Sequence, residues 1–239
     1  MSSMAAPQQY LAKVSEHFSI NDKYDSFRFE LIKPNLLEFA SGQYISIEVG
    51  EGLRRSYSIV NQPSINHLVE LCIDILPQGK GTSYLKNLKP GDEVKFLAPL
   101  GLFKVEMAGD KEEKLLFMAT GCGIAPIKSM LFDLLEDKKE KREIKLFWGL
   151  RHVEEMFWEE EFRQLEEYYE NFKMQIVLSK PPERWPMEAG HITDLVKREM
   201  NLDKTWGVYL CGSRDMVEEG KQLIESLEVP KEQIHFEKF

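Results

Sequence analysis

Cysteine and histidine are scarce in this chain of 239 residues. The only cysteines are Cys72, Cys122 and Cys211, which lie far apart in the sequence. A 2Fe–2S centre needs four cysteine thiolates, most of them closely spaced, so this chain cannot supply one by itself. The five histidines also stand apart from one another, and we expect no metal site. An odd, scattered set of cysteines is typical of free thiols in a reducing compartment, which indicates the cytoplasm.

Long apolar runs and an excess of positive charge are also missing. No apolar stretch approaches the roughly 20 residues that a membrane-spanning helix requires. Met1–Gln9 is small and polar, unlike a secretory signal. The net charge of −9 argues against nucleic acid or an anionic membrane as the main partner. We therefore expect a cytoplasmic monomer with no membrane span and no nucleic-acid partner.

Apolar and polar residues alternate through the first hundred positions. The pattern has a period of two in Phe27–Leu31, Ile45–Val49 and Val69–Ile75, as in strands that bury one face. Glycine, proline and asparagine separate these runs, for example in Lys89–Asp92. Several short strands with such turns predict a closed antiparallel barrel.

From Leu115 onward the pattern changes to strands that alternate with helices. The charged stretch Ala108–Lys114 is the predicted linker, and Leu115–Ala119 is a continuous apolar run, as in a strand buried on both faces. Further strands are expected at 144–148, 173–178, 206–210 and 234–236, and helices at 127–135, 154–168, 193–200 and 215–227. Such alternation predicts a parallel sheet with helices on both faces. We expect two domains, at residues 7–108 and 109–239.

Two glycine-containing loops are candidate phosphate sites. The first, Gly121–Pro126, follows a buried strand and begins a helix, whose N-terminal N–H groups suit an anion. A purely structural tight turn is the alternative, because any strand-to-helix turn favours glycine. The second, Gly79–Ser83, precedes a predicted helix at Tyr84–Leu88. Its Thr82 or Ser83 is expected to cap that helix, or the loop holds a diphosphate beside Lys80.

Three further segments have ordinary interpretations when each is taken alone. Arg55–Ser58 has the pattern of an exposed strand. Cys211–Ser213 follows a buried strand at its carboxyl end, where open α/β sheets bind ligands, although buried cysteines are more often inert. Phe239 has the position of a frayed terminus.

In their order along the chain these segments resemble the ferredoxin–NADP reductase superfamily, over nearly the whole sequence. Arg55–Ser58 is similar to the family's R-x-Y-S motif, and Thr120–Pro126 to its T-G-T-G-I-A-P loop, with Cys122 in place of the second threonine. Ser41–Tyr44 is similar to P-G-Q-Y, with Ser41 in place of proline. The resemblance implies a six-stranded antiparallel flavin-binding β-barrel, followed by an NAD(P)-binding α/β domain with a five-stranded parallel sheet.

The resemblance also implies roles for individual residues. Arg55 is expected to bind the flavin phosphates, Tyr57 to lie against the isoalloxazine ring, and Ser58 to lie near the flavin N5. The other expected flavin contacts are Gly79, Lys80, Gly81, Thr82 and Phe239. Those expected to bind the nicotinamide dinucleotide are Thr120, Gly121, Cys122, Gly123, Pro126, Gly149, Arg151, Ser179, Gly212 and Met216. The expected catalytic residues are Ser58, Cys211 and Glu237.

The implied function is that of an oxidoreductase with FAD, which takes a hydride from NADH or NADPH and passes electrons to a separate acceptor. A ferredoxin or an oxygenase component is the expected acceptor, because Phe236–Phe239 resembles the ending of reductases that serve oxygenases. Ser179–Pro181 favours NADH, and the preference for FAD over FMN comes from the resemblance alone. One alternative is a reductase that releases free reduced flavin. Another is a non-catalytic electron-transfer or regulatory subunit.

Overall fold

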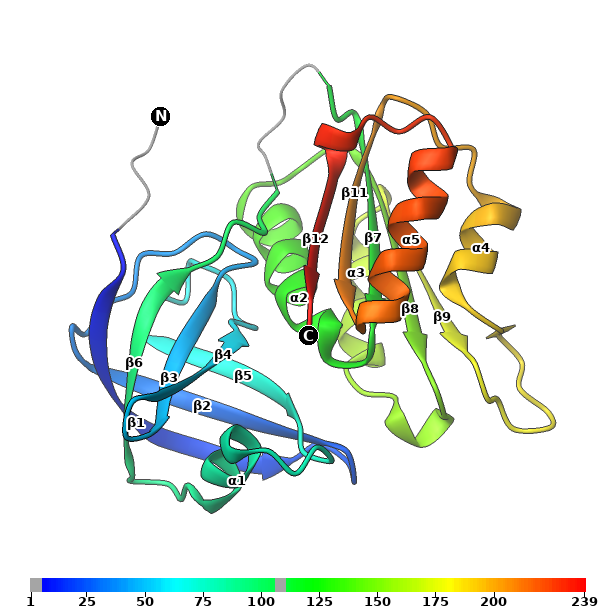
Figure 1. Ribbon diagram of the computed structural model, residues 1–239. Helices are drawn as coiled ribbons and strands as arrows, with labels where there is room; N and C mark the ends of the chain where they lie inside the picture. Colours follow the sequence, from blue (N-terminus) through cyan, green and yellow to red (C-terminus); the bar gives the residue numbers. More distant parts are fainter. Residues whose placement is uncertain (1–5, 106–110) are drawn as a thin grey trace. The chain divides into compact units, whose positions relative to one another are not determined.

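The computed structural model describes residues 6–105 and 111–239 (Figure 1). These residues form two compact units, each built on one sheet. Helix α2 (Ile124–Phe132) continues into a π-helical turn, Asp133–Asp137, and residues Ala125–Lys138 belong by their contacts to the first unit. No helix among the described residues is long and apolar enough to cross a membrane.

The first unit is a curled antiparallel sheet of six strands in the order β4-β3-β6-β1-β2-β5. Its strands are β1 (Gln8–Ser19), β2 (Tyr24–Lys33), β3 (Tyr44–Gly50), β4 (Leu53–Ser58), β5 (Leu68–Asp74) and β6 (Glu93–Leu100). Just beyond β4, the Val60 N–H donates to the carbonyl of Glu70 on β5 at 2.9 Å, which joins the two ends of the sheet. The predicted six-stranded antiparallel architecture is confirmed.

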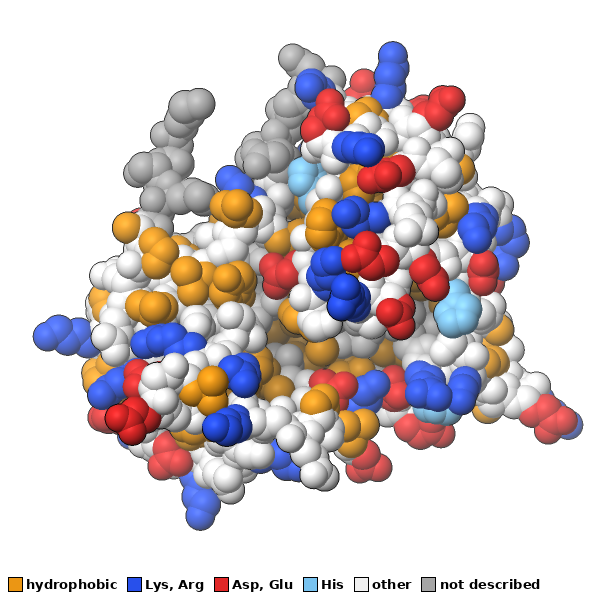
Figure 2. All heavy atoms as spheres, in the orientation of Figure 1, with side chains coloured by type: hydrophobic (Ala, Val, Ile, Leu, Met, Phe, Trp, Pro, Cys, Tyr) orange, Lys and Arg blue, Asp and Glu red, His pale blue; other side chains and the backbone are white. Residues whose placement is uncertain are grey.

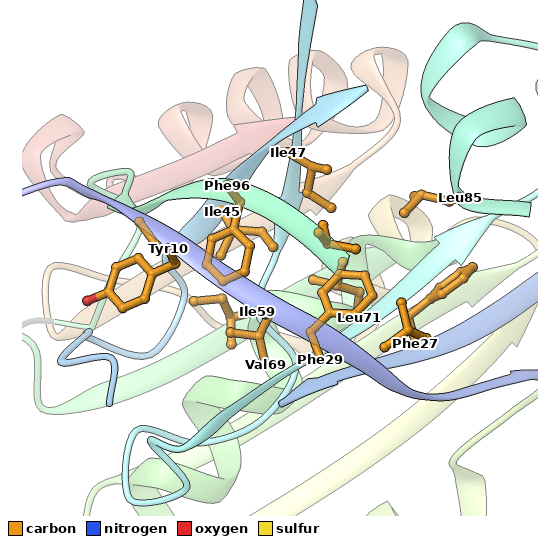
Figure 3. Packing of buried hydrophobic residues seen from close by; sticks show 14 of the residues in the cluster. Tyr10, Phe27, Phe29, Ile45, Ile47, Ile59, Val69, Leu71, Leu85 and Phe96 are labelled. Atoms are coloured by element: carbon orange, nitrogen blue, oxygen red, sulfur yellow. The ribbon is translucent and has the colours of Figure 1, made fainter. Parts of the chain in front are cut away.

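The core of this unit follows from the alternation in its strands. Phe27 and Phe29 on β2 are fully buried, whereas Arg28 between them forms ion pairs with glutamates on β1 and β5. Figure 3 shows these rings among aliphatic side chains from the surrounding strands. Each fully buried side chain of this size contributes about 1.5–3 kcal/mol to stability. The period of two in the sequence therefore sets which face each strand buries.

Helix α1 (Lys80–Asn87) begins four residues earlier than the sequence pattern predicted. Its N-cap is Gly79, with no side-chain cap hydrogen bond, and the Ser83 N–H donates to the Gly79 carbonyl at 2.9 Å. Thr82 and Ser83 therefore lie within the first turn, and the prediction that one of them caps the helix is wrong. The early start packs Gly81 against β4 and buries Leu85 in the core.

The second unit is a parallel sheet in the order β10-β9-β8-β7-β11-β12. Its strands are β7 (Lys114–Thr120), β8 (Glu143–Leu150), β9 (Phe172–Leu178), β10 (Glu188–Ala189), β11 (Trp206–Gly212) and β12 (Ile234–Lys238). The five predicted strands are present, and the two-residue β10 adds a short edge. Figure 1 shows α4 (Ile192–Glu199) and α5 (Arg214–Ser226) on one face of the sheet and α3 (Glu159–Tyr168) on the other. The predicted α/β architecture is confirmed.

The single helix predicted at 154–168 is divided in the structure. A 3₁₀ turn, Val153–Glu155, is separated from α3 by Trp158, which has a left-handed backbone with φ of 53°. The Phe157 ring beside it is buried edge-on against Trp148, with ring centroids 4.9 Å apart. Burial of this ring determines the local backbone, which a helical pattern of charges does not reveal. Part of the predicted linker, Ala108–Asp110, lies outside the described residues.

Candidate functional site at the sheet switch point and on the barrel

The parallel sheet reverses its strand order between β7 and β11. From β7 the chain proceeds to β8 and β9 on one side, whereas β11 and β12 lie on the other. In open α/β sheets, ligands bind beyond the carboxyl ends of the strands at such a switch point. At the carboxyl ends of the two central strands lie Thr120–Gly123 and Gly212–Ser213, whose first residues are the last of β7 and β11. Two motifs that are far apart in the sequence are thus neighbours.

Glycine is required where these two segments meet. A Cβ atom placed on Gly123 would lie 2.5 Å from the carbonyl carbon of Cys211 and 2.7 Å from Cα of Gly212. Gly212 in turn packs against Thr120 and Met216. The 3₁₀ turn Gly121–Gly123 has no side-chain cap hydrogen bond at its start, so its first N–H groups face no capping side chain. The loop offers backbone donors of the kind that bind phosphate.

Two side chains hold this loop in place. The Thr120 hydroxyl oxygen accepts a hydrogen bond from the Ser213 N–H at 3.1 Å, which ties the end of β7 to the start of α5. The Trp148 indole N–H donates to the Gly121 carbonyl at 3.1 Å, and the ring is fully buried on β8. Sequence reasoning missed the role of Trp148. The only sign of this role in the sequence was that Trp148 is a large aromatic residue near the end of a predicted strand.

Cys211 and Glu237 lie directly opposite each other on β11 and β12. Cys211 is fully buried, and this burial raises the pKa of its thiol well above the ordinary range, assisted first by the charge of Glu237 and then by Cys122. The group is therefore a neutral thiol at neutral pH, not a thiolate nucleophile. The Phe239 N–H donates to the Gly212 carbonyl at 3.2 Å, so the end of β12 also lies at the switch point.

The remaining residues predicted for the dinucleotide are divided between the two units. Gly149 pairs with Thr120 across β8 and β7. Arg151 and Ser179 are exposed just beyond β8 and β9, and the Ser179 N–H donates to the Leu150 carbonyl at 3.0 Å. The other two residues lie on helices. Met216 is in the first turn of α5, where its N–H donates to the Ser213 hydroxyl, and Pro126 is in the first turn of α2.

Figure 2 shows acidic and basic side chains interspersed on the face that carries α5. Lys238 on β12 forms an ion pair with Glu218 on α5, and Lys221 Nζ lies 3.9 Å from the ring centre of Phe236. These contacts join the edge strand β12 to α5. They hold the strand that carries Glu237 and that Phe239 follows.

On the first unit, the predicted flavin residues come together where α1 meets β4. A Cβ atom on Gly81 would collide with the Tyr57 phenol oxygen and lie 2.8 Å from Arg55 Cγ, so glycine permits this approach. Burial raises the pKa of the Tyr57 phenol, and the nearby charge of Arg55 opposes that rise. Ser58 is buried at the end of β4, paired with Tyr44 of β3.

This arrangement fits a diphosphate. The first N–H groups of α1 have no side-chain cap, and the cationic groups of Arg55 and Lys80 are exposed on the two elements that meet there. Backbone donors at a helix start, joined by cations, are the groups that bind phosphate oxygens. The aromatic ring of Tyr57 lies beside them on the same strand.

Comparison with known proteins identifies both units. An oxidoreductase FAD-binding domain matches residues 11–105, and an oxidoreductase NAD-binding domain matches residues 117–222. The chain belongs to the ferredoxin–NADP reductase superfamily. Its two domains are the FAD-binding and the NAD-binding domain of an oxidoreductase, so its cofactors are FAD and a nicotinamide dinucleotide.

Relatives with solved structures or curated sequences cover almost the whole chain. The cytochrome P450 reductase GcoB of Amycolatopsis has a TM-score of 0.89 and 27% identity, covering 98% of this chain and 70% of that one. A component of the Na⁺-translocating NADH-quinone reductase of Marinomonas is 32% identical over 93% of this chain and 55% of its own. The corresponding component from Serratia proteamaculans is 31% identical over 91% and 55%. The chain thus spans about half the length of these curated relatives.

Proposed function

We propose that this protein oxidises NADH and passes the electrons, through FAD, to a separate acceptor protein. The observation that carries the proposal is the switch point between β7 and β11, where a glycine loop, a buried neutral thiol and the carboxylate of Glu237 adjoin. Residues 7–108 form the FAD-binding domain in this proposal, and residues 109–239 the nicotinamide-binding domain. That boundary lies outside the described residues.

On the flavin side, each proposed role follows from position on β4 and α1. Arg55 and Lys80 neutralise the diphosphate, and the N–H groups of Gly81 and Thr82 donate to its oxygens. Gly79 is the N-cap of α1, and its own N–H donates to the Pro77 carbonyl at 3.0 Å. Tyr57 supplies a flat aromatic surface for the flavin ring, because it lies on β4 against the start of α1 at Gly81. Ser58 donates a hydrogen bond near the flavin N5. Bound FAD supplies the chemistry, accepting a hydride and releasing electrons afterwards.

On the nicotinamide side, the loop residues bind the coenzyme diphosphate, and the pair Cys211 and Glu237 on β11 and β12 orients the nicotinamide. The backbone N–H groups of Thr120–Gly123 donate to the coenzyme diphosphate. Gly149, which has no side chain, allows the coenzyme to approach the backbone closely. The neutral thiol of Cys211 contacts the nicotinamide ring without reacting with it, and Glu237 accepts a hydrogen bond from the carboxamide. Gly212 and Met216 line the same position. Phe239 covers the flavin until the nicotinamide replaces it.

Arg151 and Ser179 are proposed to contact the adenosine half of the coenzyme. Both are exposed beyond neighbouring strands, so their side chains are free to reach a ligand at this edge. The Arg151 N–H donates to the carboxylate of Glu155 at 3.3 Å, which brings a negative charge near this edge. A carboxylate there disfavours a 2′-phosphate, which supports NADH over NADPH.

The acceptor is proposed to be a ferredoxin or an oxygenase component. The similarity to a cytochrome P450 reductase supports an oxygenase system. The relatives among NADH-quinone reductases share the use of NADH in their names, which supports the coenzyme but not this acceptor. We further propose a cytoplasmic location, consistent with three cysteines that form no disulfide among the described residues.

An anaerobic titration tests this function. The purified protein, loaded with FAD, is titrated with NADH and separately with NADPH while the visible flavin band is recorded. The expected result is stoichiometric bleaching by NADH at lower concentration than by NADPH. No bleaching by either coenzyme would contradict the proposal and support a non-catalytic role. Loss of flavin on reduction, with turnover that depends on added riboflavin, would support a reductase that releases free flavin.

A further inference from the structure

Helix α2, which begins directly after the dinucleotide loop, is fixed to the barrel by buried polar contacts. The Ser41 hydroxyl donates to the Asp133 carboxylate at 2.5 Å, and both residues are 4% exposed. Lys138 Nζ donates to the same carboxylate oxygen at 2.7 Å. The Ser129 hydroxyl, fully buried, donates to the Asn61 carbonyl at 2.7 Å. Buried contacts of this kind are costly to break, because they leave a polar group without a partner.

The barrel side of this attachment leads directly to the proposed flavin site. Ser41 precedes Gly42, which has φ of +93° and packs on Met130 of α2 and on the Phe103 carbonyl. The next residue, Gln43, accepts at its carbonyl a hydrogen bond from the Ile59 N–H at 3.0 Å. Ile59 follows Ser58. A short series of contacts therefore joins Ser58 to α2.

Ser41 occupies the position where the similar P-G-Q-Y motif has proline. Proline lacks both a hydroxyl and an N–H group, so it cannot donate to Asp133. A proline at this position would leave the Asp133 carboxylate without this hydrogen bond. The hydrogen bond explains why a carboxylate is buried in the turn after α2.

We propose that Ser41 and Asp133 are positioning residues for hydride transfer. They fix α2 on the barrel, and α2 in turn fixes the point from which the loop Thr120–Gly123, continuous with it in the chain, presents the coenzyme. Neither residue contacts the reacting atoms. The inference rests on the proposed function, because it concerns transfer from coenzyme to flavin.

The test measures two half-reactions in the same FAD-loaded protein. Flavin reduction by NADH is followed anaerobically in a single turnover. Reoxidation by ferricyanide, after reduction by dithionite, reports electron transfer that needs no nicotinamide. We expect Ser41→Ala to slow reduction by about 10-fold, since small misplacements of reacting groups strongly reduce rates. Reoxidation should stay within about twofold of the wild-type rate, since it does not use this geometry.

Ser19→Ala is the matched control. The Ser19 hydroxyl also donates to a buried aspartate, Asp25, at 2.9 Å, within the same barrel but apart from α2. Both half-reactions should be unchanged in this variant. Asp133→Asn keeps an oxygen acceptor for the Ser41 hydroxyl, so it should slow reduction less than Ser41→Ala. The double variant should slow flavin reduction by less than the product of the two single effects, since both substitutions act through the same hydrogen bond.

The outcomes separate this inference from the function it rests on. Wild-type protein that no coenzyme reduces contradicts the proposed function and the inference together. Normal reduction of the wild type, with Ser41→Ala reduced at the wild-type rate, overturns the inference alone. A parallel loss of both half-reactions, with loss of bound flavin, also overturns it, because the contact would then only stabilise the barrel.

Discussion

Replacement of Gly123 by alanine is the sharpest test of the dinucleotide loop. The new Cβ would lie 2.5 Å from the carbonyl carbon of Cys211, whereas ordinary contacts begin at 3.4 Å. The Cys211 carbonyl oxygen would lie closer still, and both are backbone atoms, so no rotamer change relieves the overlap and the loop must shift by roughly 1 Å or more. Overpacking of this kind typically costs about 1–3 kcal/mol. If that cost falls on the bound state, the Kd of NADH rises about tenfold for each 1.4 kcal/mol.

The assay measures the NADH concentration that half-saturates the rate of anaerobic flavin reduction. Two other glycines provide controls. A Cβ on Gly207 would meet the carboxyl group of Glu112, at the opposite end of β11, so Gly207→Ala should lower stability and leave NADH affinity within about twofold. A Cβ on Gly50 has no atom within 4 Å, and Gly50→Ala should change neither quantity. An unchanged NADH affinity in Gly123→Ala would refute the placement of the coenzyme.

Three other predictions concern the proposed flavin site where α1 meets β4, the buried thiol of Cys211 and the buried carboxylate of Glu112. Gly81→Ala displaces Tyr57 and should weaken FAD binding about tenfold, measured by quenching of flavin fluorescence. Burial raises the pKa of the Cys211 thiol, so the folded protein holds that proton more tightly than the unfolded chain. Wild-type stability should therefore fall as the pH rises above about 8.5, by up to about 1.4 kcal/mol per pH unit more than in Cys211→Ala, in urea titrations. Tyr209→Phe removes a 2.7 Å hydrogen bond to Glu112 and should lower the free energy of unfolding by about 1–3 kcal/mol without slowing flavin reduction.

Each of these predictions has a result that would count against it. Gly79→Ala is the control for Gly81→Ala, because a Cβ on Gly79 meets nothing within 4 Å and the Gly79 N–H remains. Equal FAD affinity in the two alanine variants would contradict the packing argument. Parallel pH profiles for wild type and Cys211→Ala would show that the thiol titrates normally. Slow flavin reduction in Tyr209→Phe would mean that the Glu112 contact affects the site.

Local patterns were enough to predict the two sheets. The alternation in Phe27–Leu31 appears as β2, and the continuous run Leu115–Ala119 as the central strand β7, because strand burial repeats directly in sequence. The glycine loop was also predictable from strand, turn and helix. The segment Cys211–Ser213 was also placed at the carboxyl end of a strand, but the sequence did not show that it lies beside the glycine loop. That follows from the parallel pairing of β7 with β11.

The features that sequence did not reveal depend on tertiary contacts. The start of α1 follows from the packing of Gly81 on Tyr57, which no local capping signal describes. The Trp148 hydrogen bond joins residues 27 positions apart, and that of Ser41 joins residues 92 positions apart. A single sequence carries no periodicity that reports such pairs. These contacts are visible only once both elements are in place.

The central claim is that nicotinamide bound at the β7–β11 switch point gives its hydride to flavin held on the barrel. Anaerobic single-turnover reduction by NADH and by NADH deuterated at the transferring position tests it most directly. We expect the flavin band to bleach, deuterium to slow the step, and Gly123→Ala to raise the NADH concentration needed for half-maximal reduction. A flavin band that neither coenzyme bleaches, in protein that retains its FAD, would contradict it.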